Sequence, residues 1–284
     1  MLKSLLEQKE DDGFSIVEII VHCDNCSDNT VAIAQGFDNA KIKVIDNKQR
    51  KGFAGSVKTL LSESKSDVTV LLNDDIKIED NQFIKKLIVP FQVNENMGLV
   101  SGNPQPLRPK TFIEKAIISS SMAYVKARDF VNNSNNPNAC DGKILAVSKE
   151  LKHKMLKKEN FKDMANVDAY FYFFCRESGW DFEHNKEAMV YFRNPQTFSD
   201  YTKWFSRNNA QKYVIRSRFG EVVDIEYKIP LKILSYYCFL ESIKNPLGAI
   251  FLLGTKFYIL RKTKKYEKNF GATWNVVQSS KNLN

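Results

Sequence analysis

The chain has 284 residues, of which 43% are hydrophobic and 26% charged, and its net charge is +9. These values are typical of a globular protein with one large α/β domain and an appendage, and they exclude a disordered chain. The basic excess is local, since residues 201–284 hold 15 Lys and Arg against 5 Asp and Glu, whereas residues 1–200 hold 27 against 28. No nucleic-acid-reading motif accompanies this charge, so it favours an anionic membrane surface over nucleic acid.

Short apolar runs alternate with helix-like segments over residues 1–220. This alternation predicts an α/β fold with a mixed, mostly parallel sheet and helices on both of its faces. The expected strands are residues 16–22, 42–45, 68–72, 97–101, 144–147 and 188–192. The expected helices are residues 29–35, 54–64, 82–91, 112–131, 149–156, 167–178 and 197–218. Pro104, Pro106 and Pro109 predict a turn-rich break after the fourth strand.

The character of the chain changes near its end, where residues 229–240 and 247–260 are apolar. Neither run reaches the roughly 20 apolar residues that a membrane-spanning helix needs. Residues 261–265, Arg-Lys-Thr-Lys-Lys, follow the second run directly. We therefore divide the chain into an α/β domain, residues 1–228, and a basic, apolar helical region, residues 229–284. We expect this region to hold the protein at the cytoplasmic face of a membrane, peripherally or re-entrantly. A helical hairpin packed on the domain is the alternative.

The chain has five cysteines, an odd number whose spacing does not match a secreted disulfide framework. Cys23 and Cys26 have the CxxC spacing, but a zinc site would need a second pair. A redox pair stays open as an alternative. With no visible signal peptide, these features indicate a reducing, cytoplasmic environment.

The most informative segment is Asn73-Asp74-Asp75, which directly follows the apolar strand at residues 68–72. Polar groups at the carboxyl end of a buried parallel strand point into the crevice where open α/β sheets bind ligands. Oxygen donors at this spacing suit a hard divalent cation that also holds phosphate oxygens. The segment therefore indicates a metal-bridged nucleoside-diphosphate site, although a simple strand-to-turn junction would also favour Asn and Asp.

Three further segments have polar residues at ends of predicted elements. Asp24 lies at the carboxyl end of the first predicted strand, just after residue 22, where its carboxylate could accept hydrogen bonds from a base or ribose. Lys51 and Gly52 precede a helix and could bring charge and backbone N–H groups near phosphates. Asp168 begins another helix, where a carboxylate usually caps but can also serve as a base.

A fourth segment, residues 200–207, places Trp204 and Arg207 close together on a long helix. The aromatic ring could cover a sugar or lipid, and the guanidinium could contact a diphosphate. Amphipathic packing explains the same pattern.

Taken in order, these segments resemble the inverting family-2 glycosyltransferases of GT-A fold. Residues 23–30, Cys-Asp-Asn-Cys-Ser-Asp-Asn-Thr, stand where that family has Asp-Asp-Gly-Ser-Thr-Asp-Gly-Thr. Lys51-Gly52 looks like its Gly-Lys-Gly segment, Asn73-Asp74-Asp75 like its Asp-x-Asp, and Val167-Asp168 like its Glu-Asp. Trp204 and Arg207 match its Gln-x-x-Arg-Trp region only loosely.

The resemblance implies a role for each matching position. Asp168 would be the catalytic base, and Mg²⁺ or Mn²⁺ would be the cofactor. Nucleotide-sugar contacts are implied for Asp24, Lys51, Gly52 and Asp74, metal binding for Asn73 and Asp75, and acceptor or diphosphate contacts for Gly142, Trp204 and Arg207.

The sequence departs from the family at Cys23, Asn73 and Val167, where the family has acidic residues. The larger departure is at the start, because residues 1–8 resemble only the end of the family's first helix, without the preceding strand. The loss of a central strand leaves buried backbone groups unpaired, at about 1–3 kcal/mol each. On this basis we expect the chain to be poorly stable or inactive by itself.

The expected function is transfer of a sugar from a nucleotide-diphospho-sugar, with UDP as the expected nucleotide, to a hydroxyl of a lipid-linked or saccharide acceptor, with inversion. Two alternatives stay open: a degenerate membrane-bound partner of a complete glycosyltransferase, and a sugar nucleotidyltransferase. Nucleic acid is not an expected partner.

Overall fold

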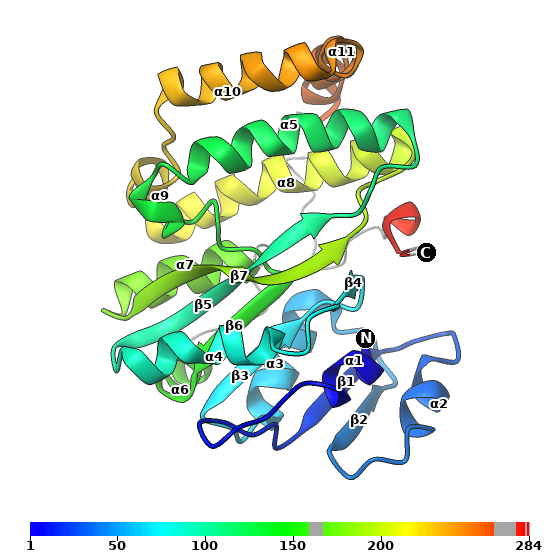
Figure 1. Ribbon diagram of the computed structural model, residues 1–284, viewed down its shortest axis with the longest axis vertical. Helices are drawn as coiled ribbons and strands as arrows, with labels where there is room; N and C mark the ends of the chain where they lie inside the picture. Colours follow the sequence, from blue (N-terminus) through cyan, green and yellow to red (C-terminus); the bar gives the residue numbers. More distant parts are fainter. Residues whose placement is uncertain (159–166, 264–276, 282, 284) are drawn as a thin grey trace.

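A computed structural model describes residues 1–158, 167–263, 277–281 and 283. The described strands form a two-stranded sheet, β1-β2, and a five-stranded sheet with the order β3-β6-β5-β7-β4 (Figure 1). Strands β3, β5 and β7 run in one direction, and β6 and β4 run in the other. The strands are β1 (Ile19–Asp24), β2 (Ile42–Asn47), β3 (Val68–Leu72), β4 (Ile76–Lys77), β5 (Met97–Pro106), β6 (Ile144–Ser148) and β7 (Asp181–Phe192).

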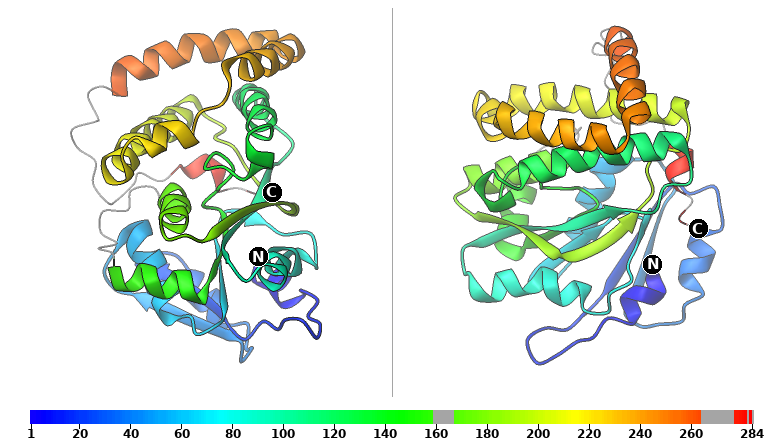
Figure 2. Two further views of the ribbon diagram at one scale, coloured as in Figure 1. Left: turned by 90° about the vertical axis from the view of Figure 1, so that its left-hand side faces the viewer. Right: turned by 45° about the horizontal axis from the view of Figure 1, so that its top comes forward.

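Helices cover both faces of the larger sheet, which confirms the expected α/β architecture (Figure 2). On one face, α3, α6 and α7 pack against the sheet, and α4 packs on the other face. The helices are α1 (Leu2–Leu6), α2 (Thr30–Gln35), α3 (Gly52–Glu63), α4 (Phe83–Val93), α5 (Phe112–Arg128), α6 (Lys149–Lys158), α7 (Val167–Glu177), α8 (Phe198–Phe219), α9 (Val222–Glu226), α10 (Leu231–Lys244) and α11 (Pro246–Thr263). Two short 3₁₀ helices are η1 (Asn132–Ser134) and η3 (Gln278–Ser280).

Strand β6 shows why the sheet has two cores. All five of its residues are buried. Successive side chains of a strand point to opposite faces, so Leu145 and Val147 join the cluster under α3, α6 and α7, while Ile144 and Ala146 join the cluster under α4. This burial on both faces explains why the run is continuously apolar rather than alternating.

Strands β1 and β2 are paired in parallel in a sheet of their own, and among the described strands β1 is not paired with β3. The two sheets are nevertheless joined by packing, since Ile16 and Ile19 contact the same core cluster as Val68 and Val70. The expectation that a further strand belongs in the sheet stays a prediction, as does the expected low stability.

The proline-rich break that the sequence predicts after the fourth strand is wrong in part, because β5 continues through Pro104 to Pro106. The pairing with β6 ends at Ser101, and beyond it β5 pairs only with β7. Proline is tolerated there because no second neighbouring strand needs its missing N–H. Strand β7 is also longer than expected. Its first half is polar and becomes a strand through its pairing with β5.

The two apolar C-terminal runs form α10 and α11, as predicted, and they make an outer layer over α5 and α8 (Figures 1 and 2). Ile117, Tyr201 and Ile259 form a small buried cluster between α5, α8 and α11. The outward side chains of both helices are nevertheless exposed, for example Phe239 at 64% and Phe257 at 70%. Within the described ranges, no helix has both the length and the hydropathy needed to cross a bilayer.

A buried ion pair joins the end of β7 to the start of α5. Arg193 Nη1 lies 3.0 Å from Glu114 Oε1, and the two side chains are 4% and 1% exposed. Glu114 also accepts hydrogen bonds from the backbone N–H of Thr111 and Lys110, completing a capping box with Thr111. Because both charges are buried, loss of one partner leaves the other uncompensated.

The Arg193→Gln substitution is therefore expected to lower the free energy of unfolding by about 3–5 kcal/mol. A urea melt followed by circular dichroism would measure this. Lys43→Gln is the matched control, because Lys43 pairs with Glu63 at 2.7 Å but both side chains are nearly half exposed. That control should change stability by no more than about 1 kcal/mol. Equal effects of the two substitutions would contradict the prediction.

Candidate active site

The carboxyl edge of β3 meets the amino end of β6. The antiparallel register sets Leu72 opposite Ile144. Directly beyond this pair, the backbone N–H of Asn73 donates to the carbonyl of Lys143 at 3.1 Å. The turn of residues 73–75 therefore lies beside the turn of residues 141–143, although about 70 positions separate them in the sequence.

Asp168, in the first turn of α7, joins this edge. Its Oδ1 accepts from the N–H of Ala169 at 2.9 Å, and its Oδ2 accepts from the N–H of Gly142 at 3.3 Å. Burial and the neighbouring Asp141 carboxylate raise the pKa of Asp168 to about 6, against the opposing effect of these N–H groups. Asp168 and Gly142, two predicted site residues, thus lie in direct contact.

Asp141 and Lys143 belong to the same edge, and sequence reasoning missed both. Lys143 Nζ lies 3.3 Å from each carboxylate oxygen of Asp141. Burial disfavours the charged form of Asp141, yet the Lys143 ammonium and backbone N–H hold its pKa below the ordinary value. The sequence does show that Asp141 directly precedes Gly142, which could have marked it as a site residue. Its pairing with the Lys143 ammonium depends on how the turn folds and is not visible in the sequence.

Asp75 has a carboxylate oxygen, Oδ1, that is buried and has no hydrogen-bond partner in the described part of the chain. Burial, followed by the charge of Asp74, raises the pKa of Asp75, and the nearby ammonium groups of Lys281 and Lys143 oppose this rise. Asp74 is mostly exposed, and its carboxylate accepts from Lys281 at 2.6 and 2.8 Å. The turn therefore presents one buried and one accessible carboxylate.

The donor set of this turn fits a hard cation such as Mg²⁺ or Mn²⁺, because its groups are carboxylate and amide oxygens. The orphaned Oδ1 of Asp75 is the observation that favours a cation here, with Asn73 as the neighbouring oxygen donor. The described residues contain no cluster of three or more His, Cys, Asp or Glu side chains that would hold a metal alone. A cation at this turn would therefore complete its coordination with oxygens from a ligand or water.

The three predicted residues at the β1 and β2 ends are also in contact. The Asp24 oxygens accept from the backbone N–H of Lys51 at 2.7 Å and of Gly52 at 2.8 Å. Gly52 has a φ of 75°, a conformation that glycine adopts without steric cost. Asp24 therefore fixes the start of α3, and the base or ribose contact expected from the sequence stays a prediction.

The structure does not bring Trp204 to this edge. Trp204 packs with Tyr201 against the small cluster between α5, α8 and α11, in line with the packing alternative. The side chain of Arg207 lies outside the part of the chain that the structure describes.

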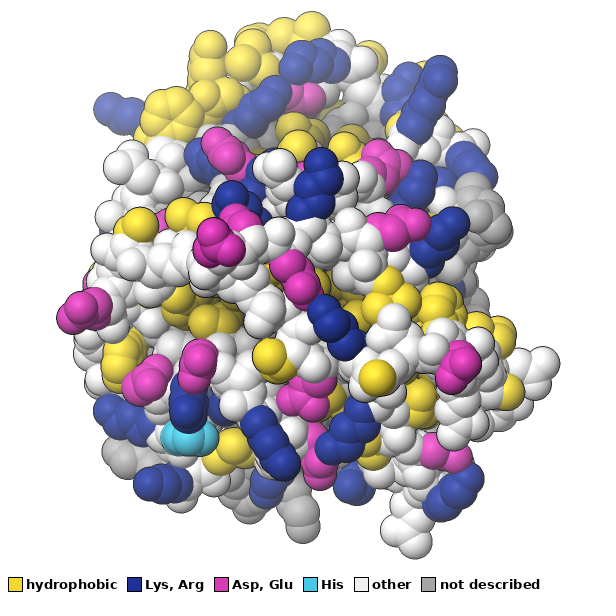
Figure 3. All heavy atoms as spheres, turned by 60° about the horizontal axis from the view of Figure 1, so that its bottom comes forward, with side chains coloured by type: hydrophobic (Ala, Val, Ile, Leu, Met, Phe, Trp, Pro, Cys, Tyr) yellow, Lys and Arg dark blue, Asp and Glu magenta, His cyan; other side chains and the backbone are white. Residues whose placement is uncertain are grey.

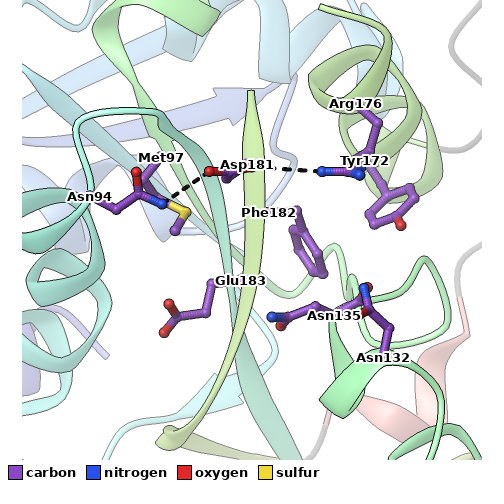
Figure 4. Close-up of a pocket in the computed structure, with 9 residues that line it drawn as sticks. All are labelled: Asn94, Met97, Asn132, Asn135, Tyr172, Arg176, Asp181, Phe182 and Glu183. Atoms are coloured by element: carbon purple, nitrogen blue, oxygen red, sulfur yellow. Dashed lines mark hydrogen bonds and ion pairs between the residues drawn. The ribbon is translucent and has the colours of Figure 1, made fainter. Parts of the chain in front are cut away.

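A separate cavity of about 270 Å³ lies at the opposite edge of the sheet (Figure 4). It is lined by Met97 at the start of β5, by Asp181 and Glu183 at the start of β7, and by Arg176 of α7. Asp181 accepts from Asn94 at 3.1 Å and lies 3.8 Å from Arg176. The cavity is therefore distinct from the carboxylates around Asp168.

Replacement of Lys143 by glutamine is expected to raise the pKa of Asp168, since the ammonium of Lys143 favours the ionised carboxylate. Carboxyl ¹³C NMR as a function of pH would measure the shift. Lys48→Gln, which removes an exposed cation at the β2 end, should leave the Asp168 titration unchanged. An unchanged titration in Lys143→Gln would show that the two charges do not interact.

Comparison with solved structures yields a mannosyltransferase, PcManGT from Pyrobaculum calidifontis, in complex with GDP-Man and Mn²⁺. The two sequences are 15% identical. The alignment covers 94% of this chain and 78% of the mannosyltransferase chain, with a TM-score of 0.58. Glucosyl-3-phosphoglycerate synthase from Mycobacterium tuberculosis is 18% identical over 72% of this chain and 68% of its own, with a TM-score of 0.47. At these identities, the first likeness establishes the fold alone, and the lower TM-score gives the second no weight.

No curated protein sequence matches the chain. The sequence model of glycosyl transferase family 2 matches residues 1–151, which is more than half of the chain. This matched range contains the first two strands, the Asn73–Asp75 turn and the Asp141–Lys143 turn. The GT-A fold expected from the sequence is confirmed, and this chain belongs to glycosyl transferase family 2.

Proposed function

We propose that this protein transfers a hexose from a nucleoside-diphospho-sugar, with UDP as the expected nucleotide, to a hydroxyl of a saccharide or lipid-linked acceptor. The observation that carries the proposal is Asp168, a half-buried carboxylate with a pKa of about 6, beside the Asp141 carboxylate and at the edge that also holds the Asn73–Asp75 turn. GDP-Man and Mn²⁺ bound to the similar mannosyltransferase support a nucleotide-sugar donor and a divalent cation. The intact geometry of this base favours an enzyme over an inactive partner.

Donor binding would use the carboxyl edge of the sheets. Asp24 holds the backbone at Lys51 and Gly52 in place, which fixes the position of the start of α3. Asn73 and Asp75 would hold Mg²⁺ or Mn²⁺, and Asp74 would remain accessible to the donor. When bound, such a cation neutralises charge on the leaving nucleoside diphosphate.

Asp168 would act as the general base. It accepts the proton of the acceptor hydroxyl while that oxygen bonds to the anomeric carbon, and the bond from this carbon to the diphosphate oxygen breaks on the opposite face. This in-line attack inverts the anomeric configuration. The pKa of about 6 suits the role, because the carboxylate is ionised at neutral pH yet basic enough to take a proton.

Gly142 keeps the acceptor side of Asp168 open. A Cβ at this position would lie 3.4 Å from Asp168 Cβ and 3.5 Å from Oδ2. A side chain there would lie against the carboxylate that must reach the acceptor, and the backbone N–H at this position donates to Oδ2. The glycine therefore both orients the base and leaves room for the acceptor.

Asp168→Asn is expected to reduce sugar transfer or donor hydrolysis by about 10²–10⁴-fold, because the amide cannot accept the proton. UDP-glucose and GDP-mannose with Mn²⁺ are suitable donors, with release of UDP or GDP measured by chromatography. In the native protein, the rate should fall as the pH drops below about 6, where Asp168 becomes protonated. Asp12→Asn, an exposed carboxylate remote from the edge, is the matched control. A native rate in Asp168→Asn would refute this role.

We further propose that α10 and α11 hold the enzyme against the cytoplasmic face of a membrane. Apolar side chains on the outward faces of both helices support this, at Tyr236, Phe239, Ile243, Leu247, Ile250, Leu253 and Phe257. Exposed Lys232 and Lys256 on the same helices complement anionic headgroups. Figure 3 shows acidic and basic side chains interspersed on another face, with hydrophobic ones gathered at its upper edge.

The double substitution Phe239→Glu and Phe257→Glu is expected to abolish cosedimentation with vesicles of phosphatidylcholine and phosphatidylserine. The reason is that each new carboxylate opposes insertion of an exposed apolar face into an anionic interface. Val93→Glu, at a side chain that is 78% exposed on α4, is the matched control and should bind normally. Equal vesicle binding of the double variant and the native protein would exclude this surface.

A further inference from the structure

The C-terminal residues 277–281 lie against the candidate site. In Figure 1, η3 lies beside the carboxyl ends of β5 and β7. The N–H of Ser279 donates to Asp200 Oδ2 at 3.0 Å, and its Oγ accepts from the N–H of Gln196 at 3.0 Å. Val277 is buried. These contacts fix the backbone of the segment to the start of α8.

This anchored backbone carries Lys281 to the Asn73–Asp75 turn. Its Nζ donates to both oxygens of Asp74, at 2.8 and 2.6 Å. Its charge opposes the rise in the pKa of Asp75 that burial causes. Thr30 lowers the pKa of Asp28 through hydrogen bonds, and the charge of Lys281 adds to that effect. Lys281 therefore lies between the loop after β1 and the turn after β3.

The ion pair between Lys281 and Asp74 is exposed enough for Lys281 to change partners. The Lys281 side chain is 42% exposed and that of Asp74 is 76% exposed. An ion pair so accessible to water contributes little to stability. The anchoring of the segment does not depend on it, because Ser279 and Val277 hold the backbone separately. The ammonium can thus change partners without leaving the site.

We propose that Lys281 is a donor-binding residue that releases Asp74 and contacts the diphosphate of the nucleotide donor. The inference rests on the proposed function, since it assumes that a nucleoside diphosphate binds at this edge. An ammonium is a compact point charge that binds phosphate oxygens well. In the free protein, the same ammonium places a positive charge beside the turn at which Asn73 and Asp75 would hold a divalent cation, and this charge opposes cation binding.

Two affinities should therefore change in opposite directions in Lys281→Gln. Titration calorimetry would measure binding of Mn²⁺ alone, and then of UDP, GDP or CDP in saturating Mn²⁺. Loss of the ammonium is expected to weaken nucleotide binding roughly tenfold. The same loss should tighten binding of Mn²⁺ alone by up to about fivefold, the limit set by an exposed ion pair. A purely structural effect would not tighten metal binding.

Lys281→Arg should restore most of the nucleotide affinity, because it keeps the charge at the same place. Lys232→Gln, an exposed cation on α10, is the control and should leave both affinities unchanged. A urea melt should give the same midpoint for all variants, since the pair is exposed. If the native protein binds none of the three nucleotides, the proposed function fails and this inference with it. If the native protein binds one and Lys281→Gln binds it equally well, only the inference is overturned.

Discussion

The antiparallel pairing of β3 with β6 is the constraint on which the candidate site depends. Its register fixes Leu72 opposite Ile144, so the chain leaving β3 must lie beside the chain entering β6. The buried apolar side chains of β6 fill both cores, and a slip of one residue would exchange their faces. The register, and with it the contact between the two turns, is therefore held by hydrophobic burial rather than by the polar residues.

Charge balance at this edge follows from that geometry. Four carboxylates lie at this edge, those of Asp74, Asp75, Asp141 and Asp168. The ammonium groups of Lys143 and Lys281 lie beside them, and the guanidinium of Arg128 also acts on Asp141. The acidic excess suits a divalent cation, and the two ammonium groups suit the phosphates that such a cation accompanies. Asp168 lies on the buried side, where desolvation raises its pKa, whereas Asp74 lies on the accessible side. One edge thus offers a base and a cation site in different environments.

The outer helices add a different kind of surface. Glu241 of α10 accepts from Lys126 of α5 at 2.7 Å, and Asn245 contacts the backbone of α5, so the layer is fixed to the domain. Its outward apolar side chains are largely exposed to solvent. A layer that is docked on one side and apolar on the other supports the proposed attachment to a membrane surface.

Through their resemblance to a known family, the ordered motifs predicted the GT-A fold. The sequence by itself determined the alternation of elements and the positions of Asp24, Asp75 and Asp168 at element ends. These features depend on local periodicity and on residue types that end strands or begin helices. Three features of the tertiary structure could not be predicted from the sequence. They are the path of β5 through Pro104, the pairing of Asp141 with Lys143, and the approach of Lys281 to Asp74. Each of these is decided by strand register or by how a terminal segment docks, and no local pattern encodes the distance between residues that far apart in the chain. Trp204 shows the same limit, since its helical position was clear from the sequence, but only the packing of α8 against α11 decided which way it faces.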